Sequence, residues 1–488
     1  RLWGIWRQGV EEHGLNERLL RQVFNLINGL AYEQAERRDD WVMDLRPRLE
    51  PVDIDMPGPM DTFSSRMWLV LAATLGREVR VPGAVLNDDL IELVKACNQA
   101  GANMSWDQEG ASSGATALEF DHTSIFVGQD TFNFYLLLCL AMSAPGVCRL
   151  NGGARLKSES MGFVSSVLSA FGARLVSLVP GSEGVPIRVE ASGQIPQSLQ
   201  IPESAPRELV LVLLLWAPLW ARARGEFQLQ MPTGPAATWG VDRIFPLWAQ
   251  MGVKWKEDGR ALILQGEELA VPSQPQIDLD PLLAGYVLAM PAFQGGRVRL
   301  YGEYPQRGVE REIINHVCYQ VGLELSFSEG RIQSTLSHVR AQTLNIDCSL
   351  APNFVPLALA LAVSAGGESL ICLDSGQDMD FAAHILSVLN MESEQRSAQE
   401  LRIRPARGRQ QEPLAVTAPT ACWGLGLALI ALTGSRLSLK NPGALTALWP
   451  QFWTLYKELP RPRVKTATSV SKKEENNRDQ KRRRRIVE

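Results

Sequence analysis

The stretch FYLLLCLAMSAPGVCRL, residues 134–150, contains the pattern that decides the fold. An apolar run comes first, a glycine follows, and a short run rich in aliphatic residues comes next. This order is typical of a helix that ends at a glycine and leads into a strand. It recurs with the glycine at positions 76, 225, 296, 367 and 434. Subtracting successive glycine positions, 146 included, gives spacings of 70, 79, 71, 71 and 67 residues, which indicates a repeated supersecondary unit.

Most copies carry a second, amphipathic helix before a further strand. Residues 164–171 end at Gly172 and precede 174–178, and the same order surrounds Gly252 and Gly322. Glycine closes helices, and β-branched or aromatic residues favour strands. The sequence therefore predicts a mixed α/β fold built from six repeated βαβαββ-like units.

The chain is long and apolar enough for two lobes. It has 488 residues, of which 45% are hydrophobic, so each lobe exceeds the size at which one core becomes stable. We expect repeats one to three in residues 57–270 and repeats four to six in residues 276–459. Pro272 and Pro275 predict a crossover between the lobes.

The two ends of the chain differ from the repeats. Residues 1–50 are predicted to form a helical amino-terminal extension, in which 14–34 resemble the last helix of an all-helical chorismate mutase. The extension lacks the cationic helix that such an enzyme needs, which favours an ordinary packing helix. Residues 461–488 are polar and strongly basic, which predicts a disordered tail, either solvated or bound to an anionic partner.

Composition argues against several classes of protein. The net charge of −4 implies no nucleic-acid partner for the folded part. The longest apolar run, 209–220, is interrupted by Pro218 and shorter than the roughly 20 residues of a membrane span. The seven cysteines and five histidines are dispersed, without a CxxC or HExxH motif, so we expect no metal site and no disulfide framework. We expect a cytoplasmic, reducing setting.

Six such units in two lobes resemble the enolpyruvyl transferase family, whose fold is a two-lobed inside-out α/β barrel. Within that family the 5-enolpyruvylshikimate-3-phosphate synthases are the most similar group. The phrases that carry the resemblance are Pro57-Gly58 followed by Ser64-Ser65-Arg66, then Leu150-Asn151-Gly152 with Arg155-Leu156-Lys157, then Asp280 with Tyr286 and Leu288, and finally Pro442 and Pro450.

The resemblance implies a reaction of the aromatic amino acid pathway that needs no cofactor. A hydroxyl of shikimate 3-phosphate adds to the central carbon of phosphoenolpyruvate, the methylene is protonated, and phosphate leaves. Because both substrates are anionic, the family's cleft must present Lys and Arg side chains, together with an acid and a base.

Several positions of this chain depart from the family's pattern. Asp61 stands where the family has a lysine, and Glu159 stands where it has an arginine that binds phosphate. Asn353 replaces the aspartate of the fifth repeat. A carboxylate at a phosphate-binding position repels the ligand, so these changes predict an altered site.

The residues that remain define the candidate site. We expect Asn353 to orient a hydroxyl, and Asp61 to be the nearest candidate base. The substrate-binding candidates are Thr62, Arg66, Thr131, Arg155, Lys157 and Asp280. Asp280 precedes Pro281, an arrangement that is also common at a turn or helix start, and we favour this interpretation over a substrate contact.

Two functions from different classes follow. The first is an enzyme of the 5-enolpyruvylshikimate-3-phosphate synthase type. The second is a catalytically inactive family member that serves as a binding or scaffold protein, with another pathway enzyme as a partner. Two sister branches fit less well: the UDP-N-acetylglucosamine enolpyruvyl transferases have a cysteine where this chain has Ala154, and the RNA 3′-phosphate cyclases have fewer repeats.

Overall fold

The computed structural model describes residues 42–46, 50–159, 162, 164–182, 184–337, 343–373, 376–405 and 414–462. The predicted helix at 14–34 and almost all of the basic tail lie outside these residues. The chain folds into two compact units. Among the described residues, unit 1 comprises 63–82 and 86–276, and unit 2 comprises the rest.

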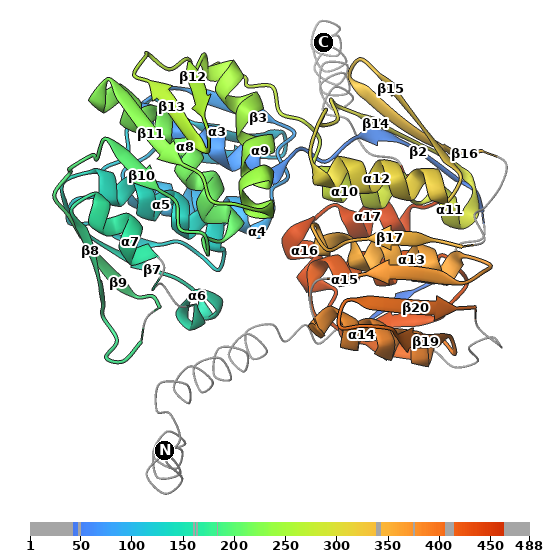
Figure 1. The fold of residues 1–488 in the computed structure, drawn as a ribbon. Coiled ribbons are helices and arrows are strands. Elements are labelled where there is room, and N and C mark those ends of the chain that lie inside the picture. Colours follow the sequence, from blue (N-terminus) through green and yellow to red (C-terminus); the bar gives the residue numbers. More distant parts are fainter. Residues whose placement is uncertain are drawn as a thin grey trace, which may run out of the picture. The chain divides into compact units, whose positions relative to one another are not determined.

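The strands form six small sheets that share one plan (Figure 1). In the second repeat, β6 and β7 pair in parallel, and the β8–β9 hairpin adds to β7 in antiparallel fashion. Helices connect the strands, which gives the predicted βαβαββ order. The elements are β6 (Ser124–Phe126), α5 (Thr131–Ser143), β7 (Gly146–Asn151), α6 (Ala154–Ser158), α7 (Val164–Ala170), β8 (Ala173–Ser177) and β9 (Ile187–Ala191).

The third and fifth repeats have the same strand order, with one parallel pair and one added hairpin. The third consists of β10 (Ser198–Gln200), α8 (Arg207–Arg224), β11 (Glu226–Gln230), α9 (Pro235–Met251), β12 (Trp255–Asp258) and β13 (Ala261–Gln265). The fifth consists of β17 (Asn345–Asp347), a 3-10 turn (Pro352–Phe354), α13 (Val355–Ser364), β18 (Ser369–Cys372), α14 (Gly376–Val388), β19 (Glu392–Gln395) and β20 (Glu400–Arg404).

One strand of the first repeat belongs to the sheet of the fourth. β2 precedes the helix of the first repeat, yet it pairs in parallel with β14 of the fourth repeat. The sheet of the first repeat keeps three strands, β3, β4 and β5. These repeats contain β2 (Val52–Pro57), α3 (Thr62–Leu75), β3 (Val79–Pro82), α4 (Asp88–Gln99), β4 (Met104–Asp107), β5 (Gly110–Ser113), α10 (Pro281–Leu288), α11 (Pro291–Gln294), β14 (Gly296–Tyr301), α12 (Val309–Gln320), β15 (Leu323–Ser328) and β16 (Arg331–Leu336).

The sixth repeat is completed by the other end of the chain. β1 pairs in antiparallel fashion with β22, where the other repeats place a hairpin strand. The sequence prediction places residues 1–50 in a helical extension and begins the first lobe at 57, whereas the structure has strands at 43–45 and 52–57 in unit 2. The elements are β1 (Met43–Leu45), β21 (Leu414–Val416), α15 (Ala421–Ala431), β22 (Leu437–Leu439), α16 (Gly443–Leu448) and α17 (Phe452–Lys457).

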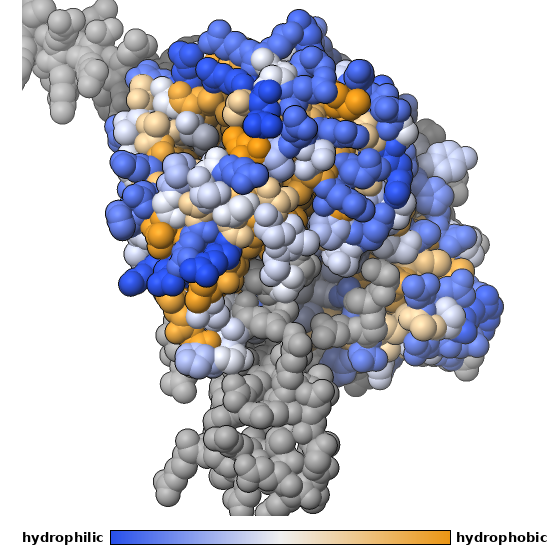
Figure 2. All heavy atoms as spheres, turned by 60° about the vertical axis from the view of Figure 1, so that its left-hand side comes forward, coloured by the Kyte–Doolittle hydropathy of each residue, from blue (hydrophilic) through white to orange (hydrophobic). Residues whose placement is uncertain are grey.

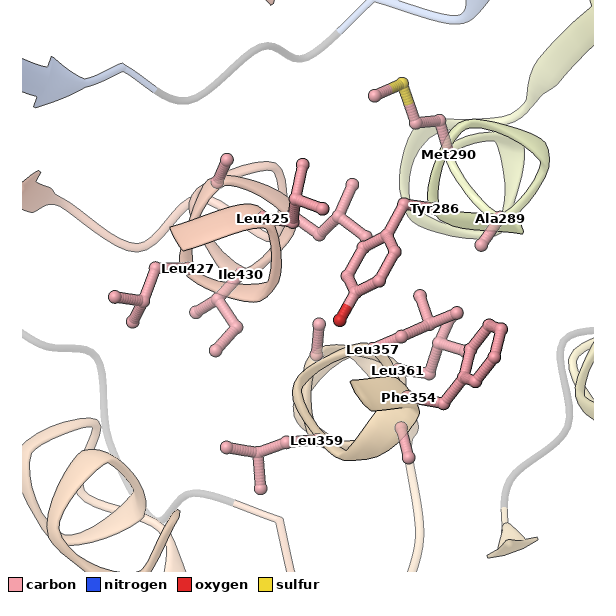
Figure 3. Close-up of a cluster of buried hydrophobic side chains, with 14 of the residues drawn as sticks. Tyr286, Ala289, Met290, Phe354, Leu357, Leu359, Leu361, Leu425, Leu427 and Ile430 are labelled. Carbon is pink, nitrogen blue, oxygen red and sulfur yellow. The ribbon is translucent and has the colours of Figure 1, made fainter. Parts of the chain in front are cut away.

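Helices that are apolar on every side form the two cores. In unit 1, every residue of α5 from Phe132 to Met142 is buried, and α8 packs against it. In unit 2, α10, α13 and α15 enclose Tyr286 (Figure 3). The Tyr286 hydroxyl donates to the Asn353 carbonyl at 2.9 Å and lies 3.4 Å from the Cys422 carbonyl. Since a buried hydroxyl needs a partner, these bonds fix the tyrosine between the helices.

The surface in Figure 2 is largely hydrophilic, with smaller hydrophobic areas between the polar side chains. In the described part of the chain, every helix is too short or too polar to cross a bilayer.

Gly296 permits the pairing of β14 with β2, and its replacement tests how much this pairing depends on a glycine. Its φ is +95°, and a Cβ there would lie 2.0 Å from the Val52 carbonyl oxygen of the paired strand β2. We expect Gly296→Ala to lower the free energy of unfolding by about 2–3 kcal/mol, because the alanine combines backbone strain with a clash. Urea denaturation followed by circular dichroism measures the change. Gly366→Ala is the control, since a Cβ there meets no atom within 4 Å; equal losses in both variants would contradict the explanation.

Candidate functional site

The start of α3 carries three of the predicted site residues. Asp61 directly precedes the helix, is only 4% exposed, and donates its backbone N–H to the Asp278 carbonyl at 2.9 Å. Thr62 is the first helical residue and is also buried. Arg66 follows one turn later and is 2% exposed. The first two residues belong to unit 2 and Arg66 to unit 1.

Arg66 is held by two residues at the start of α5. Its Nη1 forms an ion pair with the Asp130 carboxylate and donates to Asn133 Oδ1 at 3.0 Å. Asp130 is the N-cap of α5, and its Oδ2 accepts the Asn133 N–H at 3.2 Å. The Asn133 amide donates to the Asp89 carbonyl at 2.7 Å, which ties α5 to α4. This buried network (Arg66, Asp130, Asn133) joins three helices at their polar ends.

The loop before α5 is fixed by a carboxylate of α4. Glu92 Oε2 accepts the Gln129 N–H at 3.0 Å. Gly128 has a φ of +82°, and a Cβ there would lie 1.8 Å from the same Glu92 oxygen. The Gln129 side chain in turn accepts the Arg155 N–H at 3.1 Å. The Gln129 N–H of this loop is therefore already bonded to a carboxylate of the protein, that of Glu92.

Carboxylates outnumber cations around this network, and the pKa values of two of these carboxylates are raised. The pKa of Asp89 is raised to about 7, chiefly by burial and also by the nearby Asp130 charge, while Arg66 opposes the shift. Burial also raises the pKa of Glu92, although its bond to the Gln129 N–H acts in the opposite direction. Removing a carboxylate from water favours its neutral form, so this part of unit 1 resists additional negative charge.

Aromatic rings lie against three arginines of unit 1. The Arg66 guanidinium carbon lies 5.1 Å from the ring centre of Phe63 and 4.8 Å from that of Phe132. The Trp239 ring lies within 4.9 Å of the Arg207 guanidinium carbon and 4.7 Å of that of Arg243. These contacts are cation–π interactions. They hold the guanidinium groups against rigid surfaces, and the sequence prediction did not include Arg207 or Arg243.

The remaining candidates of unit 1 lie near the same loop. Thr131 is half-buried at the first position of α5. Arg155 and Lys157 are exposed on the short helix α6, and among the described residues no carboxylate forms an ion pair with either. Glu159 is half-buried at the C-cap of the same helix. The loop at 128–130 thus connects the two candidates: it leads directly into Thr131, and its Gln129 side chain accepts the Arg155 N–H.

Asp280 caps a helix in unit 2. Its Oδ1 accepts the N–H groups of Leu282 and Leu283, both at 3.0 Å, at the start of α10. The helix-start interpretation of this aspartate is therefore confirmed. Nearby, burial and the charges of Asp61 and Glu303 raise the pKa of Asp278 to about 6.

Asn353 lies in the 3-10 turn before α13, and its side chain is exposed. Its backbone carbonyl, rather than its side chain, accepts the Tyr286 hydroxyl. No group of three or more His, Cys, Asp or Glu in the described part of the chain could hold a metal ion.

Comparison with known proteins identifies the relatives of this chain. The sequence profile of the family described as EPSP synthase (3-phosphoshikimate 1-carboxyvinyltransferase) matches residues 53–372. A 3-phosphoshikimate 1-carboxyvinyltransferase of Bordetella parapertussis is 24% identical over 354 residues, 70% of this chain and 77% of that protein. The same enzyme of Bordetella petrii is 24% identical over 429 residues, 84% of this chain and 95% of that protein.

Solved structures share the fold at lower identity. EPSP synthase from Acinetobacter baumannii has a TM-score of 0.69 and 16% identity, covering 87% of this chain and all of that one. The enolpyruvyl transferase NikO from Streptomyces tendae has a TM-score of 0.66 and 16% identity, covering 84% and 95%. The predicted fold, six βαβαββ-like units of the enolpyruvyl transferase type, is therefore confirmed.

The raised pKa of Asp89 predicts how stability depends on pH. The folded chain binds a proton at Asp89 up to a pH of about 7, whereas the unfolded chain releases it near the ordinary pKa of 3.8. The contribution of Asp89 to the free energy of unfolding should therefore fall as pH rises from about 4 to about 7. Asp89→Asn should make this slope shallower by up to about 1.4 kcal/mol per pH unit, measured by urea denaturation across that range.

Asp107→Asn is the matched control for this experiment. Asp107 is exposed and accepts from Arg80 Nη2 at 2.6 Å, which lowers its pKa. Its titration thus lies below the window, and the control should keep the wild-type slope. An Asp89→Asn slope equal to that of the control would show that Asp89 is ionised throughout.

Proposed function

The chain belongs to the EPSP synthase (3-phosphoshikimate 1-carboxyvinyltransferase) family, and from this premise we propose that it transfers the enolpyruvyl group of phosphoenolpyruvate to shikimate 3-phosphate. The proposal places it in the aromatic amino acid pathway, acting in the cytoplasm without a cofactor. The observation that carries it is Arg66: a buried, rigidly held guanidinium on the second turn of α3, at the position of a family substrate arginine.

Each proposed role follows from the chemistry of the side chain. Arg66 binds a carboxylate or phosphate oxygen, since a guanidinium offers two parallel donors. Arg155 and Lys157 are exposed cations close to the loop at 128–130 and contact phosphate. Thr62 and Thr131 donate hydroxyl bonds, and Asp280 acts through its cap on α10.

The acid–base step needs two further groups. The attacking hydroxyl must lose a proton as its oxygen bonds to the central carbon of phosphoenolpyruvate. Asn353 orients this hydroxyl, and Asp61 is the proposed proton acceptor. Protonation of the methylene gives a tetrahedral adduct that carries a methyl group. Loss of one proton from this methyl group, as the C–O bond to phosphate breaks, restores the double bond and completes the transfer.

A second function is supported by a specific observation. Arg66, the proposed anion-binding residue of α3, already forms an ion pair with Asp130, a carboxylate of the protein itself. Asp61, Glu159 and Asn353 differ from the family's pattern in charge or in proton affinity. Loss of one preorganised donor typically costs about a hundredfold to a thousandfold in rate. An inactive protein that binds another pathway enzyme is therefore the alternative.

Phosphate release from phosphoenolpyruvate and shikimate 3-phosphate distinguishes the two functions. We expect turnover by the wild-type chain, with the product identified by its mass. Asn353→Ala should reduce kcat by about a hundredfold. Because the side chain is exposed, its loss should leave the fold intact.

Ser328→Ala, an exposed change in unit 2, is the control and should keep the wild-type rate. No turnover and no binding of either substrate by the wild-type chain would favour the scaffold function. Turnover that survives Asn353→Ala would remove Asn353 from the mechanism.

A further inference from the structure

The ion pair between Arg66 and Asp130 has a property that none of the family resemblances predicts. The two residues are 64 positions apart, on α3 and at the start of α5. Arg66 has a side-chain exposure of 3%, whereas that of Asp130 is 18%. The arginine is therefore enclosed and the carboxylate forms the outer partner.

The arginine cannot move toward a ligand without losing several contacts. Its guanidinium lies against Phe63 and Phe132, and Asn133 Oδ1 accepts a further bond at 3.0 Å. Asn133 is itself fully buried and bonded to the Asp89 carbonyl. Because all these groups belong to packed helices, the position of the guanidinium is fixed.

Asp130 is the partner that can leave. Its carboxylate is bonded to the Asn133 N–H at 3.2 Å and to Arg66, and its side chain is partly open to solvent. Rotation of one side chain thus uncovers a guanidinium that is already oriented.

We propose that Asp130 is a resident anion on Arg66, and that a carboxylate or phosphate of a ligand binds Arg66 only by displacing it. This inference rests on the proposed function, in which Arg66 binds substrate, and adds Asp130 as a specificity-determining residue. The cost of displacement selects against single small anions and favours ligands with further contacts to nearby cations, such as the exposed Arg155 and Lys157 of α6.

The charge surroundings of Asp130 determine the size of this cost. A displaced carboxylate loses its cationic partner while Asp89 and Glu92 remain beside it on α4. Charge-assisted bonds of this kind contribute more than neutral ones. The resident anion should accordingly lower the affinity for phosphate by about tenfold or more.

Asp130→Asn tests the proposal without removing the helix cap. Asparagine caps helices as well as aspartate does, so the bond to the Asn133 N–H survives while the charge is lost. The titrant is inorganic phosphate, and then phosphoenolpyruvate, in isothermal calorimetry with the full chain. We expect Asp130→Asn to bind both about tenfold or more tightly than the wild-type chain.

Three further variants make the result specific. Asp130→Ser also caps a helix, and it should show the same gain. Asp107→Asn removes a different, exposed carboxylate paired with Arg80 and should bind like the wild type. The double change Arg66→Gln with Asp130→Asn should lose the gain, because the uncovered cation is absent.

The outcomes separate this inference from the proposed function. Folded Asp130→Asn and Asp130→Ser variants that bind phosphate no more tightly than the wild type would overturn the resident anion, even if the wild type turns over. Tighter binding by both variants, lost in the double variant, would support it, even if no variant releases phosphate from the two substrates.

Discussion

A helix without a polar side must be enclosed completely, and this requirement organises both units. Eleven consecutive residues of α5, from Phe132 to Met142, are buried, and α8 and α13 are nearly as apolar. Burial of such side chains is the main favourable term in folding. The other elements are arranged around these helices, and the amphipathic helices and the small sheets supply the cover. Each repeat contributes one apolar helix, and two of the sheets take a strand from another part of the chain.

Enclosure of the helices also determines where chemistry can take place. A buried helix presents polar groups only at its ends, where backbone N–H groups need partners. Arg66 lies on the second turn of α3 and Asp130 caps α5, so two enclosed helices bring a cation and an anion together near their amino ends. In unit 2, the Asp280 side chain caps the amino end of α10. These side chains are held rigidly because the helices that carry them cannot shift in the packed core.

Structural features that depend on neighbouring residues can be predicted from the sequence, whereas contacts between residues far apart in the chain cannot. The six apolar helices and the cap of Asp280 follow from local pattern, and both are found. The pairing of β2 with β14 places Val52 opposite Gly296, although the two residues are far apart in the chain. Nothing in the sequence of either strand indicates that the other is its partner. Asp130 is visible in the sequence as a polar residue before an apolar helix, but its pairing with Arg66 and the burial of Asp89 require the packed structure.

The independence of fold and charge explains how the family's architecture can tolerate changes of charge in a candidate site. The apolar helices provide most of the stability, whereas the residues predicted from the sequence to depart from the family's pattern, Asp61, Glu159 and Asn353, lie outside those helices. Changes at these three positions alter electrostatics without removing an apolar side chain from the core. A buried charge must still be compensated, and Arg66 is compensated by Asp130 whether or not a ligand is present. The fold therefore does not depend on substrate to neutralise its buried arginine, and the site can change its affinity for anions by changing one capping residue.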